Sequence, residues 1–174
     1  MINYYPEKPM LPYMKTSVEM AAIIGYLKSV EADKEIKRMS YVMFRNEGAN
    51  GKSGINNNYC GFQADSGRWA AKFDNEISGI VSKVENGTGK QRLFLAFNNV
   101  GGCLDMLLDR VEGRGLYVGG TTHKVWVNEH IDNPTELARA YQKEWVKGSV
   151  KAEPTPTELN NFLSMYNQAA KLFS

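Results

Sequence analysis

The chain has 174 residues, with 21 lysines and arginines against 19 aspartates and glutamates, giving a formal net charge of +2. This near-neutral charge gives no support for nucleic-acid binding, and no apolar run approaches the length of a membrane-spanning helix. The length suits one domain with a substantial core. We therefore expect a single domain over residues 1–174 that binds no nucleic acid and has no membrane span.

The N-terminal part predicts an extended arm followed by a helix. Residues 1–15 contain three prolines and three tyrosines, a composition that indicates an arm packed on the body of the protein. Thr16 and Glu19 have the spacing of a capping box. Apolar residues then recur at helical spacing over 20–27, so we expect a first helix there.

The rest of the chain predicts a small β-hairpin among helices. A second helix is expected from about Asp33, and a short one around Trp69. The β-favouring runs 76–85 and 90–97 are joined by Asn86-Gly87-Thr88-Gly89, a strong hairpin signal. Gly79 indicates a bulge or a close backbone approach.

Three further helices are expected after the hairpin. One starts at Asn98 or Asn99, one at Asn133-Pro134 with Gly148 as its stop, and the last follows a connector over residues 149–157. A short strand or loop is expected over residues 121–128. The predicted class is α+β, mainly α, with a small β-hairpin lobe.

The second helix ends on a carboxylate, Glu47, directly before Gly48. Gly48 suits the left-handed residue that commonly ends a helix. The negative end of the helix dipole disfavours a further negative charge at Glu47. If the surroundings are also partly dry, both effects raise its pKa, as a general acid requires. The alternative is an ordinary solvated glutamate.

A glycine- and asparagine-rich loop follows Glu47 and leads into an aromatic segment. Amide groups suit sugar hydroxyls and acetamido groups, and aromatic rings offer flat apolar faces. We therefore interpret the region as a carbohydrate cleft, although asparagines in turns often hold only their own loop. The candidate substrate-binding residues are Asn57, Asn58, Tyr59, Gln63, Asp65 and Trp69.

These residues give the sequence a resemblance to the lysozyme-like peptidoglycan N-acetylglucosaminidases of glycoside hydrolase family 73. That family has a Glu-Ser-Gly-Trp-Gly-Lys-Ser-like segment before an Asn-Asn-Leu-Phe-Gly-Ile-Lys-Ala-like one. The stretch from Leu107-Leu108 to Leu116-Tyr117-Val118-Gly119 is also similar to the family. The likeness spans about residues 36 to 148. Gln63 departs from the family and is closer to the related lytic transglycosylases. The matching positions are Glu47, Gly48, Gly51, Lys52, Ser53, Asn57, Asn58, Tyr59, Gly61, Phe62, Ala64 and Asp65.

The resemblance implies a lysozyme-like helical domain whose cleft faces the β-lobe, with Tyr117 lining the active site. Glycoside hydrolysis normally needs a second group besides the acid. We rank Glu76 first because it begins the hairpin strand. The other candidates are Asp65, Asp74 and Glu85, and in the family the substrate's own acetamido group is an alternative.

Other chemistries have little support. His123 and His130 lack a third ligand at suitable spacing, so we predict no metal site and no cofactor. Cys60 and Cys103 are expected to be free thiols, with a single disulfide as the alternative. Cys60 as a papain-like nucleophile has no histidine near it in sequence.

The resulting prediction is a peptidoglycan glycan-strand hydrolase that cleaves the β-1,4 bond after N-acetylglucosamine. A muramidase or lytic transglycosylase of the same fold, and a non-catalytic module that binds glycan or a protein, stay open. The N-terminus lacks a secretory signal pattern. We therefore expect export to the periplasm or cell wall by phage lysis or a secretion system, an antibacterial role, and a cognate immunity protein that blocks the cleft.

Overall fold

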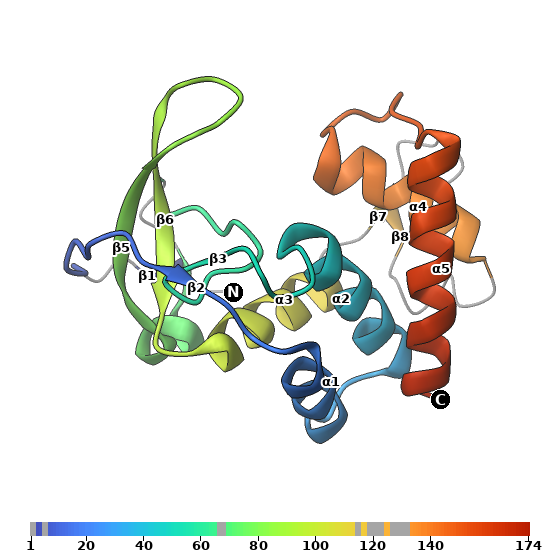
Figure 1. Ribbon diagram of the computed structural model, residues 1–174, viewed down its shortest axis with the longest axis horizontal. Coiled ribbons are helices and arrows are strands. Elements are labelled where there is room, and N and C mark those ends of the chain that lie inside the picture. Colours follow the sequence, from blue (N-terminus) through green and yellow to red (C-terminus); the bar gives the residue numbers. More distant parts are fainter. Residues whose placement is uncertain (1–2, 5–6, 66–68, 114–115, 118–123, 126–132) are drawn as a thin grey trace. The chain divides into compact units, whose positions relative to one another are not determined.

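The computed structural model describes residues 3–4, 7–65, 69–113, 116–117, 124–125 and 133–174 (Figure 1). It confirms an α+β protein that is mainly helical, with small antiparallel sheets. No helix in these ranges is long and apolar enough to cross a membrane. The elements in chain order are β1 (Asn3–Tyr4), β2 (Lys15–Thr16), α1 (Met20–Ser29), α2 (Lys34–Glu47), β3 (Gly54–Ile55), β4 (Trp69–Ala70), the 3-10 helix η1 (Ala71–Glu76), β5 (Ile77–Val84), β6 (Gln91–Phe97), α3 (Val100–Gly113), β7 (Leu116–Tyr117), β8 (Lys124–Val125), α4 (Pro134–Tyr141), the π-helix η3 (Gln142–Val146) and α5 (Pro156–Leu172).

The chain divides into two compact units. The first unit comprises Met1–Ile23 and Met43–Leu107, and the second comprises Ile24–Val42 and Leu108–Ser174. The division falls inside α1, α2 and α3, so each of these helices contributes one part to each unit.

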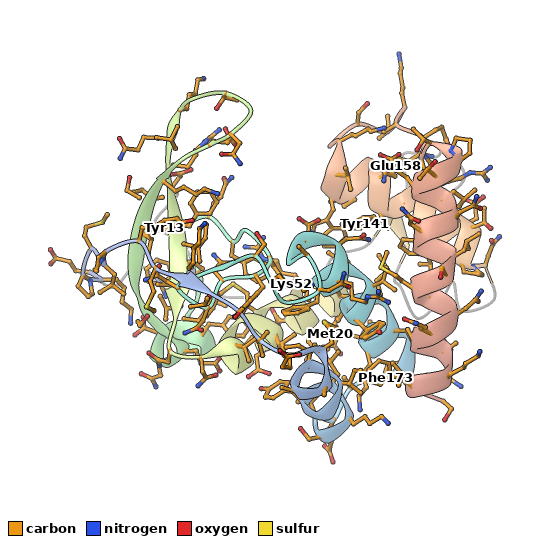
Figure 2. All side chains as sticks on the ribbon, in the orientation of Figure 1. Tyr13, Met20, Lys52, Tyr141, Glu158 and Phe173 are labelled. Atoms are coloured by element: carbon orange, nitrogen blue, oxygen red, sulfur yellow. The ribbon has the colours of Figure 1, made fainter. Side chains whose placement is uncertain are left out.

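The first unit is built around the hairpin of β5 and β6, which confirms the strands predicted on either side of the Asn-Gly turn. The N-terminal arm lies along β5, where Leu11 donates its N–H to the carbonyl of Ile80 at 2.8 Å. On the far side of β6, Ala64 donates its N–H to the carbonyl of Leu93 at 2.7 Å. Both edges of the hairpin are therefore covered by backbone from elsewhere in the chain, and Tyr13 marks the arm in Figure 2.

Gly79 has both properties predicted for it. The register of β5 against β6 shifts between Ile77 and Gly79, as in a β-bulge. A Cβ at this position would lie 2.6 Å from the carbonyl oxygen of Pro9. Only glycine lets the arm approach the strand this closely.

The caps predicted for two helices are confirmed, and the cap predicted for α1 is wrong. The side chain of Asn99 accepts the N–H of Gly101 in α3, and that of Asn133 accepts the N–H of Glu136 in α4. Thr16, by contrast, lies in β2. Its hydroxyl accepts the N–H of Asn57 at 3.0 Å, a long-range bond that local spacing cannot reveal.

Two further local predictions need correction. Trp69 belongs to strand β4, paired with β1, and the helical turn begins only at Ala71. Gly48 is not left-handed; that conformation falls on Ala49 and Asn50. Gly48 is needed for space instead, because a Cβ there would lie 3.0 Å from the carbonyl oxygen of Phe44.

The second unit contains a polar cluster around Glu35, whose side chain is fully buried. Glu35 forms an ion pair with Arg38 and accepts the hydroxyl of Tyr166 from α5 at 2.5 Å. Arg38 also donates to the carbonyl of Phe173 at 3.0 Å, at the end of α5 where Figure 2 labels that residue. The hydrogen bonds of this cluster connect the start of α2 to α5.

Candidate functional site

Glu47 is the last residue of α2, and its side chain is exposed. The turn before it is anchored in the core of the first unit, because Phe44 is fully buried with its ring 5.3 Å from that of Tyr59. The carboxylate is therefore carried on a rigid helix end. The dry surroundings that a general acid needs are not supplied by the protein here, so a bound ligand would have to supply them.

The loop after Glu47 contains an unusual run of left-handed residues. Ala49, Asn50, Asn56 and Asn57 have φ angles of 48°, 55°, 48° and 62°. Asparagine tolerates this conformation better than most residues, whereas for alanine it costs about 1 kcal/mol or more. Such strain persists only where the surrounding structure imposes it, and it clusters at functional sites.

Asparagine side chains hold this loop in place. Asn58 is only 4% exposed; its amide donates to the carbonyls of Phe62 and Leu95 and accepts the N–H of Phe62. Asn57 donates to the carbonyls of Phe97 and Asn98. In this conformation both predicted substrate-binding amides stabilise their own loop.

Asn56, which was not predicted as a functional residue, binds the N-terminal arm in the same way. Its amide oxygen accepts the N–H of Met14 at 2.8 Å, and its amide nitrogen donates to the carbonyl of Pro12 at 3.0 Å. The sequence signal for this role is the run of three consecutive asparagines, residues 56–58. Their side chains form hydrogen bonds with several neighbouring segments.

Tyr59 and Trp69 lie in the core. The Tyr59 ring packs over Gly54, where a Cβ would lie 2.5 Å from it, and burial raises the pKa of its hydroxyl. The indole of Trp69 donates to Asp74 at 3.3 Å. Neither side chain presents an open face to a sugar, since the two residues are 2% and 5% exposed.

Gln63 and Asp65 are the exposed members of the predicted sugar-binding set. Gln63 faces Phe94 of β6 through an isolated bridge. Asp65 accepts the N–H of Leu93 at 2.7 Å and pairs with Arg92 at 3.3 Å. Asp65 therefore holds its segment against the hairpin, whereas the exposed side chain of Gln63 has no described hydrogen bond or ion pair.

Glu76 is the carboxylate with the most distinctive surroundings. It is the last residue of η1, immediately before β5, and its Oε2 is buried without a hydrogen-bond partner in the described part of the chain. A Cβ at Gly102 of α3 would lie 3.0 Å from that oxygen. Burial, and then the negative charge of Asp105, raise the pKa of the Glu76 carboxyl.

Asp105 is a neighbour of Glu76 that was not predicted from the sequence. It lies one turn after the Gly101-Gly102 pair, a position where a polar residue interrupts an apolar helix. The missing side chain of Gly102 gives room for Glu76 against α3. Only the tertiary fold brings the carboxylates of Glu76 and Asp105 within electrostatic range of each other.

The segments that carry Glu47 and Glu76 meet at Asn98. Asn98 donates its N–H to the carbonyl of Glu76 at 2.9 Å, and its own carbonyl accepts from Asn57 of the loop after Glu47. The loop and the start of the hairpin thus share one hydrogen-bonded corner. Both candidate carboxylates belong to the first unit.

The competing carboxylates are engaged elsewhere. Asp74 forms an ion pair with Lys8 at 3.0 Å. The pKa of Glu85 is lowered, mainly by the Thr88 hydroxyl that donates to it at 2.6 Å. Among the carboxylates first considered as the second catalytic group, Glu76 is therefore the one whose surroundings favour holding a proton.

The remaining predicted residues give less information. The backbone of Tyr117 pairs with Lys124 in β7 and β8, and its side chain lies outside the described residues, as do Trp126, His123 and His130. Cys60 and Cys103 are not joined in a disulfide, as expected. Within the described ranges, no group of three or more His, Cys, Asp or Glu side chains is placed to hold a metal ion.

The comparisons with known proteins provide no information about this site. No protein-family model, no curated protein and no solved structure matches the chain.

Proposed function

We propose that the chain is a glycoside hydrolase that cuts the glycan strand of peptidoglycan, at the β-1,4 bond after N-acetylglucosamine. The observation that carries this proposal is the exposed Glu47, held at a rigid helix end directly before a strained loop that is hydrogen-bonded to the β-lobe. Backbone strain clusters at functional sites, and this strained loop begins directly after Glu47.

The reaction requires a proton donor and a second group. Glu47 was predicted as the donor, with Glu76 as its partner. The raised pKa of Glu76 supports the opposite division, because a donor must hold its proton at the working pH. Glu47, exposed to solvent, suits a group that activates water or stabilises positive charge. The exposed Gln63 is the proposed contact to the substrate in this unit.

The test is digestion of purified peptidoglycan by the wild type, Glu47→Gln and Glu76→Gln, with the products identified by mass spectrometry. Glu19→Gln is the matched control, because Glu19 is an exposed glutamate of the same unit. Fragments with reducing N-acetylglucosamine ends support the proposal. Reducing muramic ends indicate a muramidase, and anhydro-muramic ends a lytic transglycosylase.

The roles of the two carboxylates can be separated by rescue. An activated aryl glycoside, whose leaving group needs no proton, restores the rate of the variant that lacks the acid. Azide restores the rate of the variant that lacks the nucleophile or base. If both variants retain wild-type activity on peptidoglycan, neither carboxylate takes part in catalysis.

A non-catalytic module that binds glycan or a partner protein is the second candidate. It is favoured by the exposure of Glu47 and by the internal hydrogen bonds of Asn57 and Asn58. Sedimentation with insoluble peptidoglycan, without release of fragments, would support this candidate over the enzyme.

Location and partners follow from the same proposal. A glycan-strand hydrolase acts in the periplasm or cell wall, and as an antibacterial effector it would require an immunity protein that blocks the cleft in the producing cell. Co-purification with products of neighbouring genes tests for such a partner. Recovery of the chain alone would count against it.

A further inference from the structure

A hollow of about 350 Å³ lies in the second unit, and none of the residues that line it was considered above as catalytic or substrate-binding. We call it the lysine hollow, because three lysines contribute to its wall. It is formed by the last turn of α1, the first turns of α2 and the end of α5. The lining residues are Lys28, Ala32, Lys34, Lys37, Leu172, Phe173 and Ser174.

The three ammonium groups are unpaired. In the described ranges, Lys28, Lys34 and Lys37 have no ion pair and no side-chain hydrogen bond. Several other lysines do have carboxylate partners: Lys8 with Asp74, Lys143 with Glu153 and Lys147 with Glu158. Three like charges around one hollow repel one another, and an anion among them would remove that repulsion.

Two acidic side chains close to these lysines in sequence, Asp33 and Glu35, bind groups of the protein itself. Asp33 caps α2, where its Oδ1 accepts the N–H of Glu35 at 2.8 Å. The carboxylate of Glu35 is buried between Arg38 and Tyr166. The positive charge around the hollow is therefore not neutralised by these two acids, and the N-terminus of the 14-residue helix α2 adds its dipole in the same sense.

Size and lining define the kind of ligand. Small-molecule sites typically measure about 300–1,000 Å³, so this hollow exceeds the needs of a lone oxyanion. Leu172 and the largely buried Phe173 add apolar surface beside the lysines. A phosphate group carries about −1.5 to −2 charges and three acceptor oxygens, which matches three lysines better than a single carboxylate does.

We propose that the lysine hollow binds a small molecule that carries a phosphate group on a compact, partly apolar body. The phosphate lies among Lys28, Lys34 and Lys37 at the start of α2, and the body of the ligand lies against Leu172. The proposal does not depend on glycan cleavage, because none of these residues belongs to the first unit.

The test uses phenyl phosphate and inorganic phosphate as probes. Affinity is measured by isothermal titration calorimetry, with sodium chloride at matched ionic strength as the blank and benzoate as the carboxylate comparison. The protein carries any tag at its N-terminus, because Ser174 lines the hollow. We expect phenyl phosphate to bind more tightly than inorganic phosphate, and benzoate to bind at least tenfold more weakly than phenyl phosphate.

Two variants locate the site. Lys34→Gln combined with Lys37→Gln should weaken phenyl phosphate binding by about tenfold or more, since each removes a charge-assisted contact. Lys171→Gln, an exposed lysine of α5 outside the hollow, should leave it unchanged. Circular dichroism checks that the double variant is folded.

Three results would overturn the proposal: phosphate heats that sodium chloride reproduces, benzoate binding equal to that of phenyl phosphate, or full affinity in a folded double variant. Glu47→Gln should bind phenyl phosphate as the wild type does. A loss of glycan cleavage with retained phosphate binding therefore separates this proposal from the proposed function.

Discussion

Two glutamates, one in each unit, differ in how far they are buried and in whether their carboxylate oxygens have partners. Glu35 in the second unit is completely buried and satisfied by Arg38 and by the hydroxyl of Tyr166. Glu76 in the first unit is only partly buried, but one of its oxygens has no described partner and Asp105 adds a like charge. A buried carboxylate whose oxygens all have hydrogen-bond or ion-pair partners usually has a structural role. A buried carboxylate that lacks such partners is a candidate for a catalytic role.

The largest effect is expected from breaking the satisfied cluster. Glu35→Ala leaves the Arg38 guanidinium without its partner and the Tyr166 hydroxyl without its acceptor. Removing one member of a buried pair costs about 3–5 kcal/mol, so the free energy of unfolding should fall by that order. Urea denaturation measures it. Glu31→Ala, an exposed glutamate just before α2, is the control and should change stability little.

A smaller loss is expected when only one partner of Glu35 is removed. Tyr166→Phe keeps the ring in its place beside Phe162 but removes the hydroxyl, so one carboxylate oxygen loses its donor. The expected cost is about 1–3 kcal/mol, the usual penalty for an unsatisfied buried group. This variant makes Glu35 resemble Glu76. A cost below about 0.5 kcal/mol would mean that the two environments differ less than we argue.

The same cluster predicts an unusual tyrosine titration. Burial, followed by the hydrogen bond to Glu35, raises the pKa of Tyr166 to about 12. Absorbance titration of the wild type against Tyr166→Phe isolates this hydroxyl. In Glu35→Gln its pKa should fall, because the negative charge that opposes ionisation is gone. An unchanged value would mean that burial alone sets it.

The strained loop beside Glu47 should respond to relief of strain. Ala49 is left-handed with a φ of 48°, a conformation that glycine adopts without steric cost. Ala49→Gly should therefore raise the free energy of unfolding by up to about 1 kcal/mol. Gly87→Ala, where an added Cβ meets nothing within 4 Å, is the neutral comparison. If activity falls while stability rises, the strain contributes to positioning Glu47.

Local signals in the sequence were enough to predict much of this fold. Helical spacing located the main helices, and the Asn-Gly turn located the hairpin. Asn98 or Asn99 was expected to cap α3, and Asn133 to cap α4; Asn99 and Asn133 are the caps. These features depend on residues within one or two turns of each other. The expected Thr16 cap failed because the Thr16 hydroxyl is taken by Asn57, about forty residues away in the chain.

The surroundings of the candidate site were less predictable for the same reason. Glu47 and Glu76 could be selected as carboxylates at the ends of elements. The effect of Asp105 on Glu76 depends on α3 approaching the start of the hairpin. The lysine hollow likewise needs the end of α5 beside the start of α2, a pairing that no spacing within either helix predicts.

The smallest expected effect tests Glu76 directly, through the pH dependence of stability. The folded-state pKa of Glu76 is raised above the ordinary glutamate value of 4.5, so the native state holds this proton more tightly than the unfolded chain does. The resulting stabilisation is complete below about pH 4.5 and is lost as pH rises through the folded pKa. Glu76→Gln lacks this loss. As the pH rises above about 4.5, its free energy of unfolding should therefore increase relative to the wild type, by about 1 kcal/mol or less because of solvent screening.

For Glu85→Gln we expect the stability difference from the wild type to change with pH in the opposite direction. The pKa of Glu85 is lowered, mainly by the Thr88 hydroxyl, so its contribution is present at neutral pH and lost as pH falls through the folded value. Urea denaturation across pH 3 to 7 should therefore give difference curves with opposite slopes for the two variants. A flat difference curve for Glu76→Gln would show that Glu76 is solvated like any surface acid, and its place in the proposed mechanism would be lost.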